Sequence, residues 1–176
     1  MYKHSFTVGG VDMRKEFGLI AESFEDGLAP PLRPRKVVVP QRDGAFDYKA
    51  KYYDERELII NCASIALLSR GACRELSRVL ARKEKIIRWD EEDKYYIGRV
   101  YDPTAIERLA GSAKRFAIHF ICEPFAFGRQ VTEVFDGRSA LAYQGTARTP
   151  TRITITNTEA YALNGITITM KEAINP

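Results

Sequence analysis

The stretch from Ala113 to Gln130, AKRFAIHFICEPFAFGRQ, constrains the fold more than any other part of the chain. A two-residue period divides it into two faces, with Phe116, Ile118, Phe120 and Cys122 on one and Ala117, His119 and Ile121 on the other. Because both faces are largely apolar, we expect a strand in the centre of a sheet. Pro124 has no N–H to give to a ladder and ends the pairing. The stretch is therefore the predicted last core strand of one domain and the exit to a second segment.

Short alternating segments between turn residues indicate that most of the chain before this strand is also β. We predict strands at 5–8, 11–13, 17–24, 35–39, 45–53, 56–63, 86–89 and 94–101. Hairpin turns are expected at Gly9-Gly10, at Asp43-Gly44 and at the acidic run Asp90–Asp93. The Pro-rich residues 27–34 favour a loop or arm, so residues 35–63 are predicted to form a long projecting hairpin.

Residues 69–85 change to a helical period. Apolar side chains recur at i, i+3, i+4 and i+7, namely Ala72, Cys73, Leu76, Val79 and Leu80. Ser69 is the expected N-cap, and Lys83 and Lys85 suit the negative end of the helix dipole. The pattern predicts an amphipathic helix of about four turns, and residues 104–109 are expected to add one short helical turn.

After Gln130 the helical pattern does not return. We predict only strands there, at 131–135, 140–143, 152–156 and 166–170. The predicted organisation is therefore a domain at 1–130 and a short all-β segment at 131–176.

Bulk composition sets broad limits on function. A chain of 176 residues fits one domain or one domain plus part of a second. A net charge of +4 permits an acidic partner without requiring one. The three cysteines, Cys62, Cys73 and Cys122, lack C-x-x-C spacing and are predicted to be buried free thiols in a reducing compartment. We find no signal peptide and no apolar run long enough for a bilayer, and we expect synthesis in a cytoplasm without membrane insertion.

Residues that could support catalysis or cofactor binding are scarce. The chain has two histidines, His4 near the terminus and His119 in the predicted central strand. We interpret His119 as a core or interface histidine with one hydrogen bond rather than a general base. No spacing resembles a zinc or calcium site, and neither a G-x-G-x-x-G motif nor a Walker loop is present. We therefore expect no enzyme activity, no cofactor, no metal and no small-molecule substrate.

Two charged groups are candidates for a surface function. Arg70, Arg74, Arg78 and Arg82 recur every four residues and form what we call the arginine stripe. Like charges at this spacing cost a few tenths of a kcal/mol in an isolated helix. The stripe is either a solvated face or a surface that meets acidic groups, on nucleic acid or on a neighbouring subunit. The acidic run Asp90–Asp93 is interpreted as a solvated turn in preference to a cation site.

Tyrosines cluster in two of the predicted hairpins, at positions 48, 52 and 53 and at positions 95, 96 and 101. Such clusters suit a stacking platform for bases, a protein–protein interface or core packing. Our candidate interface residues are Tyr48, Tyr52, Tyr53, Arg70, Arg74, Arg78, Arg82, Glu91, Glu92 and Asp93.

The order of several motifs resembles a known family. A Phe-x-Val-Gly-Gly hairpin is followed by Phe17-Gly18-Leu19, a Pro/Arg loop, the Val-Val-Val-Pro-x-x-Asp-Gly turn at 37–44 and a helix with Leu76 and Leu80. An Ile-x-Trp hairpin with an acidic turn and the Phe116–Phe125 strand complete the series. This order is similar to that of the distal tail proteins of phages and prophages with long non-contractile tails. The resemblance covers about residues 2–130.

The resemblance implies a non-enzymatic structural protein of the virion. Distal tail proteins form hexameric rings through an N-terminal β-sandwich with a flanking helix and a projecting hairpin. The implied fold class is mainly β (α+β). The ring joins the tail tube protein to baseplate, tail-tip, tail-fibre or receptor-binding proteins, and the implied location is the phage tail tip, after synthesis in the bacterial cytoplasm.

In the family a galectin-like sandwich commonly follows the ring domain. Residues 131–176 are too few for the whole of it, although 143–155 resemble its opening strands. Either this outer domain is reduced, or the chain is a fragment of a longer protein. A rival interpretation is a basic nucleic-acid-binding module that uses the arginine stripe and the tyrosines.

Overall fold

The structure is a computed structural model that describes residues 3–33, 36–38, 40–41, 43–47, 52–103, 105–106, 110, 114–134, 145, 147, 151–158, 160–162 and 164–168. Internal contacts divide the chain into two units, Met1–Leu141 and Ala142–Pro176. Within the described residues, no helix is long and apolar enough to cross a membrane.

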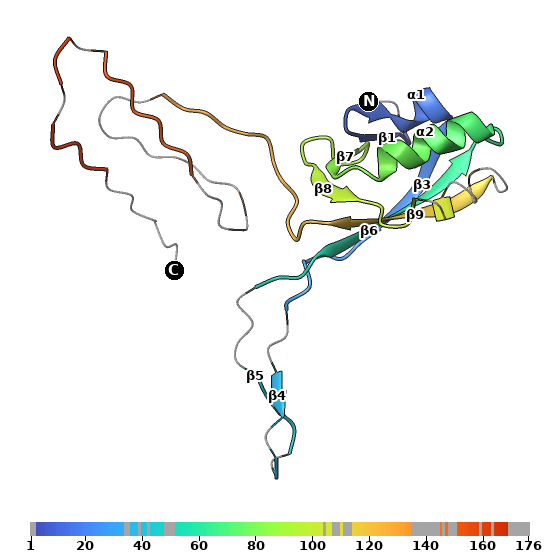
Figure 1. The fold of residues 1–176 in the computed structure, drawn as a ribbon, viewed down its shortest axis with the longest axis horizontal. Helices are drawn as coiled ribbons and strands as arrows, with labels where there is room; N and C mark the ends of the chain where they lie inside the picture. The colour runs from blue at the N-terminus through green and yellow to red at the C-terminus, as the bar shows by residue number, and fades with distance from the viewer. Residues whose placement is uncertain are drawn as a thin grey trace. The chain divides into compact units, whose positions relative to one another are not determined.

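The first unit is built on one seven-stranded antiparallel sheet (Figure 1). Its strands are β1 (Phe6–Val8), β2 (Val11–Asp12), β3 (Leu19–Asp26), β6 (Arg56–Ser64), β7 (Glu84–Arg88), β8 (Tyr96–Arg99) and β9 (Arg115–Cys122). They lie in the order β2-β1-β7-β8-β9-β6-β3. Strand β9 pairs with β6 on one side and with β8 on the other, so the predicted central position of this strand is confirmed.

The two faces of β9 differ in burial. Phe116, Ile118, Phe120 and Cys122 point into the core. Burying an apolar side chain of this size contributes about 1.5–3 kcal/mol. On the opposite face, His119 is exposed and Nδ1 makes one hydrogen bond, 2.9 Å long, to Glu57. The single hydrogen bond agrees with the prediction for His119, but the residue is not in the core.

The sheet curls until its last strand, β3, approaches its first ones. The Ala21 N–H donates to the His4 carbonyl, just before β1, at 2.9 Å. Further along β3, Asp26 accepts hydrogen bonds from Arg88 of β7 and from Tyr96 of β8. A register shift between Ala21 and Ser23 marks a bulge, which increases local twist. The curled sheet thereby encloses its apolar face, and the resulting core includes residues from all the longer strands.

The predicted mainly β fold with a flanking helix is confirmed. The arrangement differs from a sandwich in one respect: the seven strands form one continuous hydrogen-bonded sheet rather than two facing sheets. The pairing of β8 with β9 makes it continuous, because it joins the β7–β8 hairpin to the β9–β6–β3 half.

Helix α2 (Arg70–Leu80) is the flanking helix that the sequence predicts. Ser69 is its N-cap and accepts from the Ala72 N–H at 3.2 Å. Cys73, Leu76 and Leu80 are buried on its inner side. The helix ends five residues before the predicted Lys85, because Glu84 and Lys85 are already paired in strand β7.

A second helix, α1 (Met13–Phe17), was not expected from the sequence. The Asp12 carboxylate caps it by accepting from the backbone N–H groups of Arg14 and Lys15 at 2.9 and 3.1 Å. Gly18 ends it with a φ of 65°, a left-handed conformation that favours glycine. Asp12 followed by Gly18 is the sequence pattern that could have predicted this helix. The alternation of residues 11–13 favoured a strand instead.

Residues 27–55, which we call the arm, continue the β3–β6 ladder outward. Asp26 pairs with Leu58, Leu32 faces Tyr53, and Lys36 of β4 (Lys36–Val38) pairs with Asp47 of β5 (Ala45–Asp47). The register is nearly constant, so the chain from β3 to β6 is one interrupted hairpin, longer than the predicted 35–63. Exposed apolar side chains along the arm are Leu28, Leu32, Val37, Val38, Tyr52 and Tyr53.

After residue 130 the structure differs from the prediction. The described residues 131–134, 151–158 and 164–168 form no strand, and the strand predicted at 140–143 lies outside the described residues. The apolar side chains there, such as Val134 and Ile155, are exposed. An alternating segment becomes a stable strand only with a pairing partner and a layer to cover its apolar side, and the described part of this region has neither.

Position 98 of β8 has room only for glycine, because strand β9 packs directly against it. A Cβ at this position would lie 2.5 Å from Cys122 Sγ and 2.7 Å from the Ile121 carbonyl oxygen. We therefore expect Gly98→Ala to lower the free energy of unfolding by about 1–3 kcal/mol, the usual cost of overpacking. Urea denaturation measures the difference.

Gly128→Ala is the matched control, because nothing lies within 4 Å of a Cβ there. We expect it to change the free energy of unfolding by less than about 0.5 kcal/mol. Equal stability of the two variants would show that β8 and β9 are not packed this closely.

Candidate interaction surfaces

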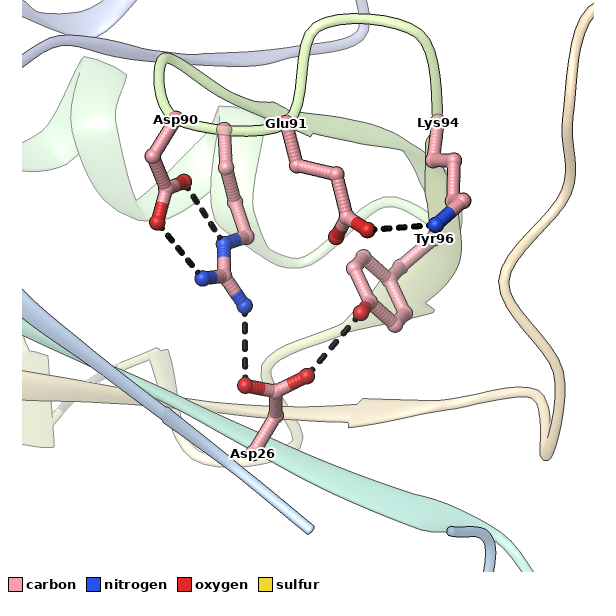
Figure 2. Close-up of polar contacts among 6 residues, drawn as sticks. Asp26, Asp90, Glu91, Lys94 and Tyr96 are labelled. Carbon is pink, nitrogen blue, oxygen red and sulfur yellow. Dashed lines mark hydrogen bonds and ion pairs between the residues drawn. The ribbon is translucent and has the colours of Figure 1, made fainter. Parts of the chain in front are cut away.

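A polar network joins β3 to the β7–β8 hairpin (Figure 2). The two oxygens of Asp26 accept from Arg88 Nη1 at 2.8 Å and from the Tyr96 hydroxyl at 3.0 Å. Arg88 also donates from Nε and Nη2 to the two oxygens of Asp90, at 2.9 and 2.7 Å. The Arg88 side chain is 12% exposed, so this guanidinium holds two carboxylates largely away from water.

The network changes the ionisation of its members. The hydrogen bonds from Arg88 lower the pKa of Asp90, and those to Asp90 raise the pKa of Arg88. Burial, followed by the hydrogen bond to Asp26, raises the pKa of Tyr96 to about 12. The Arg88–Asp90 ion pair therefore stays charged at neutral pH, and Tyr96 stays protonated as a hydrogen-bond donor.

The acidic turn Asp90–Asp93 divides into an inner and an outer half. Asp90 is bound to Arg88, and Glu91 accepts from Lys94 Nζ at 2.7 Å. Glu92 and Asp93 are exposed. Among the described residues no group of three or more His, Cys, Asp or Glu side chains could hold a metal ion.

Arg70, Arg74 and Arg78 of the arginine stripe lie on the exposed side of α2, and Arg82 is exposed two residues beyond the end of the helix. Arg78 forms a two-point ion pair with Glu75, one contact being Nε to Oε2 at 3.1 Å. For Arg70 and Arg74 the described part of the chain provides no ion-pair partner. Arg70 is also the first helical residue, at the positive end of the helix dipole, where a cation is unfavourable. Among the described residues none of the four arginines pairs with Glu91, which is bound to Lys94, or with Asp93.

Exposed aromatic side chains gather where the arm leaves the sheet. Tyr53 packs edge-to-face on Phe125, with ring centroids 5.0 Å apart, and Tyr52 beside it is exposed. We call Tyr52, Tyr53 and Phe125 the aromatic base. Tyr95 stacks on Phe127 at 5.4 Å, whereas Tyr96 is buried in the core. Tyr48 lies outside the described residues.

Sequence reasoning missed Arg56, the first residue of β6. It is in phase with Leu58 and Ile60, faces inward and is 7% exposed. Its guanidinium carbon lies 5.8 Å from the centroid of the Tyr96 ring. The two-residue alternation of β6 could have predicted that Arg56 faces inward. A charged residue at the end of a strand is, however, usually predicted to face solvent.

The three cysteines are buried and not disulfide-bonded, as the sequence predicts. Burial raises the pKa of the Cys62 and Cys122 thiols to about 12. Both are thus protonated at neutral pH and poor nucleophiles.

Two shallow hollows lie on the outer face of the sheet. One, of about 400 Å³, is lined by Val100, Tyr101, Asp102, Ala105, Ile106, Ala117, His119 and Ile121. The other is lined in part by Glu22, Asn61 and Arg115, and the Arg115 guanidinium pairs with Glu22. The first hollow is mainly apolar, and in the second the charged side chains of Arg115 and Glu22 pair with each other. Neither hollow therefore brings together a nucleophile, a base and an orienting group.

Comparisons with known proteins agree with this geometry. The family described as phage tail protein RIFT-related domain matches residues 15–122, from helix α1 to the end of β9. The fold is similar to that of the crystal structure of the phage SPP1 Dit (gp 19.1) protein, with a TM-score of 0.56 and 18% identity. That match covers 72% of this chain and 53% of the SPP1 protein, so the chain spans about half the length of its structural relative. No protein with a curated description matches the chain.

The network of Figure 2 gives a stability prediction. Asp26→Asn leaves Arg88 with one carboxylate partner fewer in a largely buried site. We expect it to lower the free energy of unfolding by about 1–3 kcal/mol, as for a hydrogen bond to a charged group. Chemical denaturation at neutral pH measures this loss.

The control is Glu22→Gln on the same strand, which breaks the exposed ion pair with Arg115. Exposed pairs contribute about 0–1 kcal/mol, so this variant should be close to wild type. Asp26→Asn should also lower the pKa of Tyr96, visible in an alkaline titration of tyrosinate absorbance. Wild-type stability in both variants would mean that the network does not close the sheet.

Proposed function

Because the chain belongs to the phage tail protein RIFT-related domain family, we propose that it is a subunit of a ring-shaped hub at the distal end of a phage tail. Membership of this family makes the chain a phage tail protein and a structural component of the virion. The ring, its hexameric symmetry and its position between the tail tube and the tail-tip proteins are the proposal.

Two comparisons support this proposal. The SPP1 Dit protein, which has the same fold, is described as a paradigm of the hub adsorption apparatus in phages that infect Gram-positive bacteria. The family match spans the arm and all strands of the curled sheet except β1 and β2, and these are the parts expected to form a ring. Residues 131–176 would then be the remainder of an outer segment that faces baseplate, tail-fibre or receptor-binding proteins.

The arm is the observation that carries the proposal. It is a two-stranded hairpin whose apolar side chains, including Leu28, Val38 and Tyr52, are exposed. Contiguous exposed apolar groups and unpaired strand edges are usually covered by a partner. An assembly of identical chains would cover each arm with the neighbouring subunit.

Charge supports a head-to-tail contact. A ring needs a heterologous interface, in which two different patches of the same chain meet. The arginine stripe on α2 and the exposed Glu92 and Asp93 in the turn after β7 are two such patches of opposite sign. Among the described residues neither Arg74 nor Asp93 has an ion-pair partner, so the stripe of one subunit can meet the acidic turn of the next.

Electron microscopy of the purified protein, combined with light scattering, tests the ring directly. We expect a closed oligomer with a central hole, at least at high protein concentration. A stable monomer that binds oligonucleotides with a steep salt dependence would contradict the proposal and favour a nucleic-acid-binding module.

Charge reversal tests the interface. We expect Arg74→Glu to weaken assembly, with every 1.4 kcal/mol lost corresponding to about tenfold in the dissociation constant. Arg74 has no ion pair among the described residues, so the stability of the single chain should change by less than about 0.5 kcal/mol. Analytical ultracentrifugation over a concentration series measures both oligomer size and affinity.

Arg129→Glu is the control, an equal charge change at an exposed position outside the stripe. It should assemble as wild type does. Combining Arg74→Glu with Asp93→Arg should restore part of the lost affinity. If the single reversal assembles normally, the stripe is a solvated face.

A further inference from the structure

Arg56 is a buried cation that has no counter-ion among the residues that the structure describes. Only 7% of the residue is exposed, and its Nε is enclosed and has no hydrogen-bond partner. In the part of the chain that the structure describes, no hydrogen bond or ion pair reaches the other guanidinium nitrogens either. Burying an unpaired charge is costly, so an inward-facing arginine in this state indicates a missing partner.

Three carboxylates close to Arg56 in the chain or near its neighbours Tyr96 and Cys122 make other contacts. Both oxygens of Asp26 are used, one by Arg88 and one by the hydroxyl of Tyr96. Glu57, the next residue of β6, binds His119, and Glu123, the residue after β9, pairs with Lys83 Nζ at 2.6 Å. These three acids are therefore engaged elsewhere, and the exposed Glu55, which precedes Arg56, makes no ion pair with it among the described residues.

The guanidinium is nevertheless held in place. The Tyr96 ring lies 5.8 Å from its centre, and the hydroxyl of that ring is fixed by Asp26. Nε is fully enclosed, whereas Nη1 and Nη2 are not among the enclosed atoms. The two terminal nitrogens of the planar guanidinium are thus accessible. This is the geometry in which arginine binds a carboxylate through two parallel hydrogen bonds.

The position of Arg56 favours a ligand from another protein. Arg56 pairs with Cys122 at the end of the β6–β9 ladder, where the arm begins. The aromatic base, Tyr52, Tyr53 and Phe125, lies at the same end of the ladder and offers exposed apolar surface. Interface cores commonly combine aromatic residues with arginine. The net charge of +4 also favours an acidic partner.

We propose that Arg56 is the receptor for a carboxylate of a second protein chain that docks at the base of the arm. The carboxylate is an Asp or Glu side chain or a chain terminus, and it completes the charge balance that Arg56 lacks. The proposal requires no ring and is independent of oligomer symmetry.

Sodium acetate serves as the probe for this site, compared with sodium chloride at equal ionic strength. An ion that binds only the folded state raises the melting temperature by mass action. We expect acetate to give a saturable rise in melting temperature above that in chloride. We expect Arg56→Met to lose this rise and, in chloride, to melt no lower than wild type, because it removes an uncompensated buried charge.

Arg99→Met is the matched control, since Arg99 also lies near a tyrosine ring, that of Tyr101, but is not buried. It should keep the acetate response. If Arg56→Met fails to fold, the Nε–H resonance of Arg56 in the wild-type protein should still shift on acetate titration, with Arg56→Lys identifying the signal. Equal melting temperatures in acetate and chloride together with an unmoved resonance would overturn the proposal, as would an acetate response retained by Arg56→Met.

The source of the carboxylate is settled by a second arm of the experiment. Arg56→Met is compared with wild type at concentrations at which the wild type assembles. Loss of assembly identifies a second copy as the donor, whereas normal assembly assigns the carboxylate to a different tail protein. The acetate response is measured on single chains and does not depend on the ring. The Arg56 proposal can therefore be overturned while the ring forms, or supported while no ring forms.

Discussion

The contact of Asp26 with Arg88 and Tyr96 is the interaction on which the architecture depends. Strand β3 is last in the sheet order, yet Asp26 reaches β7 and β8, the third and fourth strands of that order. The sheet must therefore curl, and this curl converts an open layer with one apolar face into an enclosed core. Charged groups perform this role because Arg88 is only slightly exposed and is satisfied by two carboxylates, so it is not an unpaired buried charge.

The arm follows from the same strand pair. Strands β3 and β6 do not stop at the edge of the core, and their ladder resumes at Leu32 and Tyr53 and again in β4 and β5. Inside the core the pair is covered on its inner side, while outside it the apolar side chains have no layer to pack on. One hairpin thus has two parts, since its inner half closes the sheet and its outer half exposes apolar side chains.

Arg56 marks the boundary between these halves. Nearly every other inward position of β6 is apolar, and a well-satisfied core would place an apolar residue here as well. Places where a local rule of core composition is broken are often functional. The buried cation, the aromatic base and the arm meet at one end of the β6–β9 ladder, and the arginine stripe adds a second charged surface along and just beyond α2. Phage tail proteins act by assembling, and this chain concentrates its unsatisfied groups where a neighbour could reach them.

Local patterns in the sequence determined the mainly β class, the central strand at 115–122, the turn at Gly9-Gly10, the Ser69 cap and the buried thiols. These features depend on neighbours a few residues apart, which period and turn chemistry reveal. Tertiary structure alone decided that β3 closes the sheet, that Arg56 is buried and that residues 151–158 form no strand. Each of these depends on which distant segment supplies a partner or a covering layer, and no local pattern specifies that.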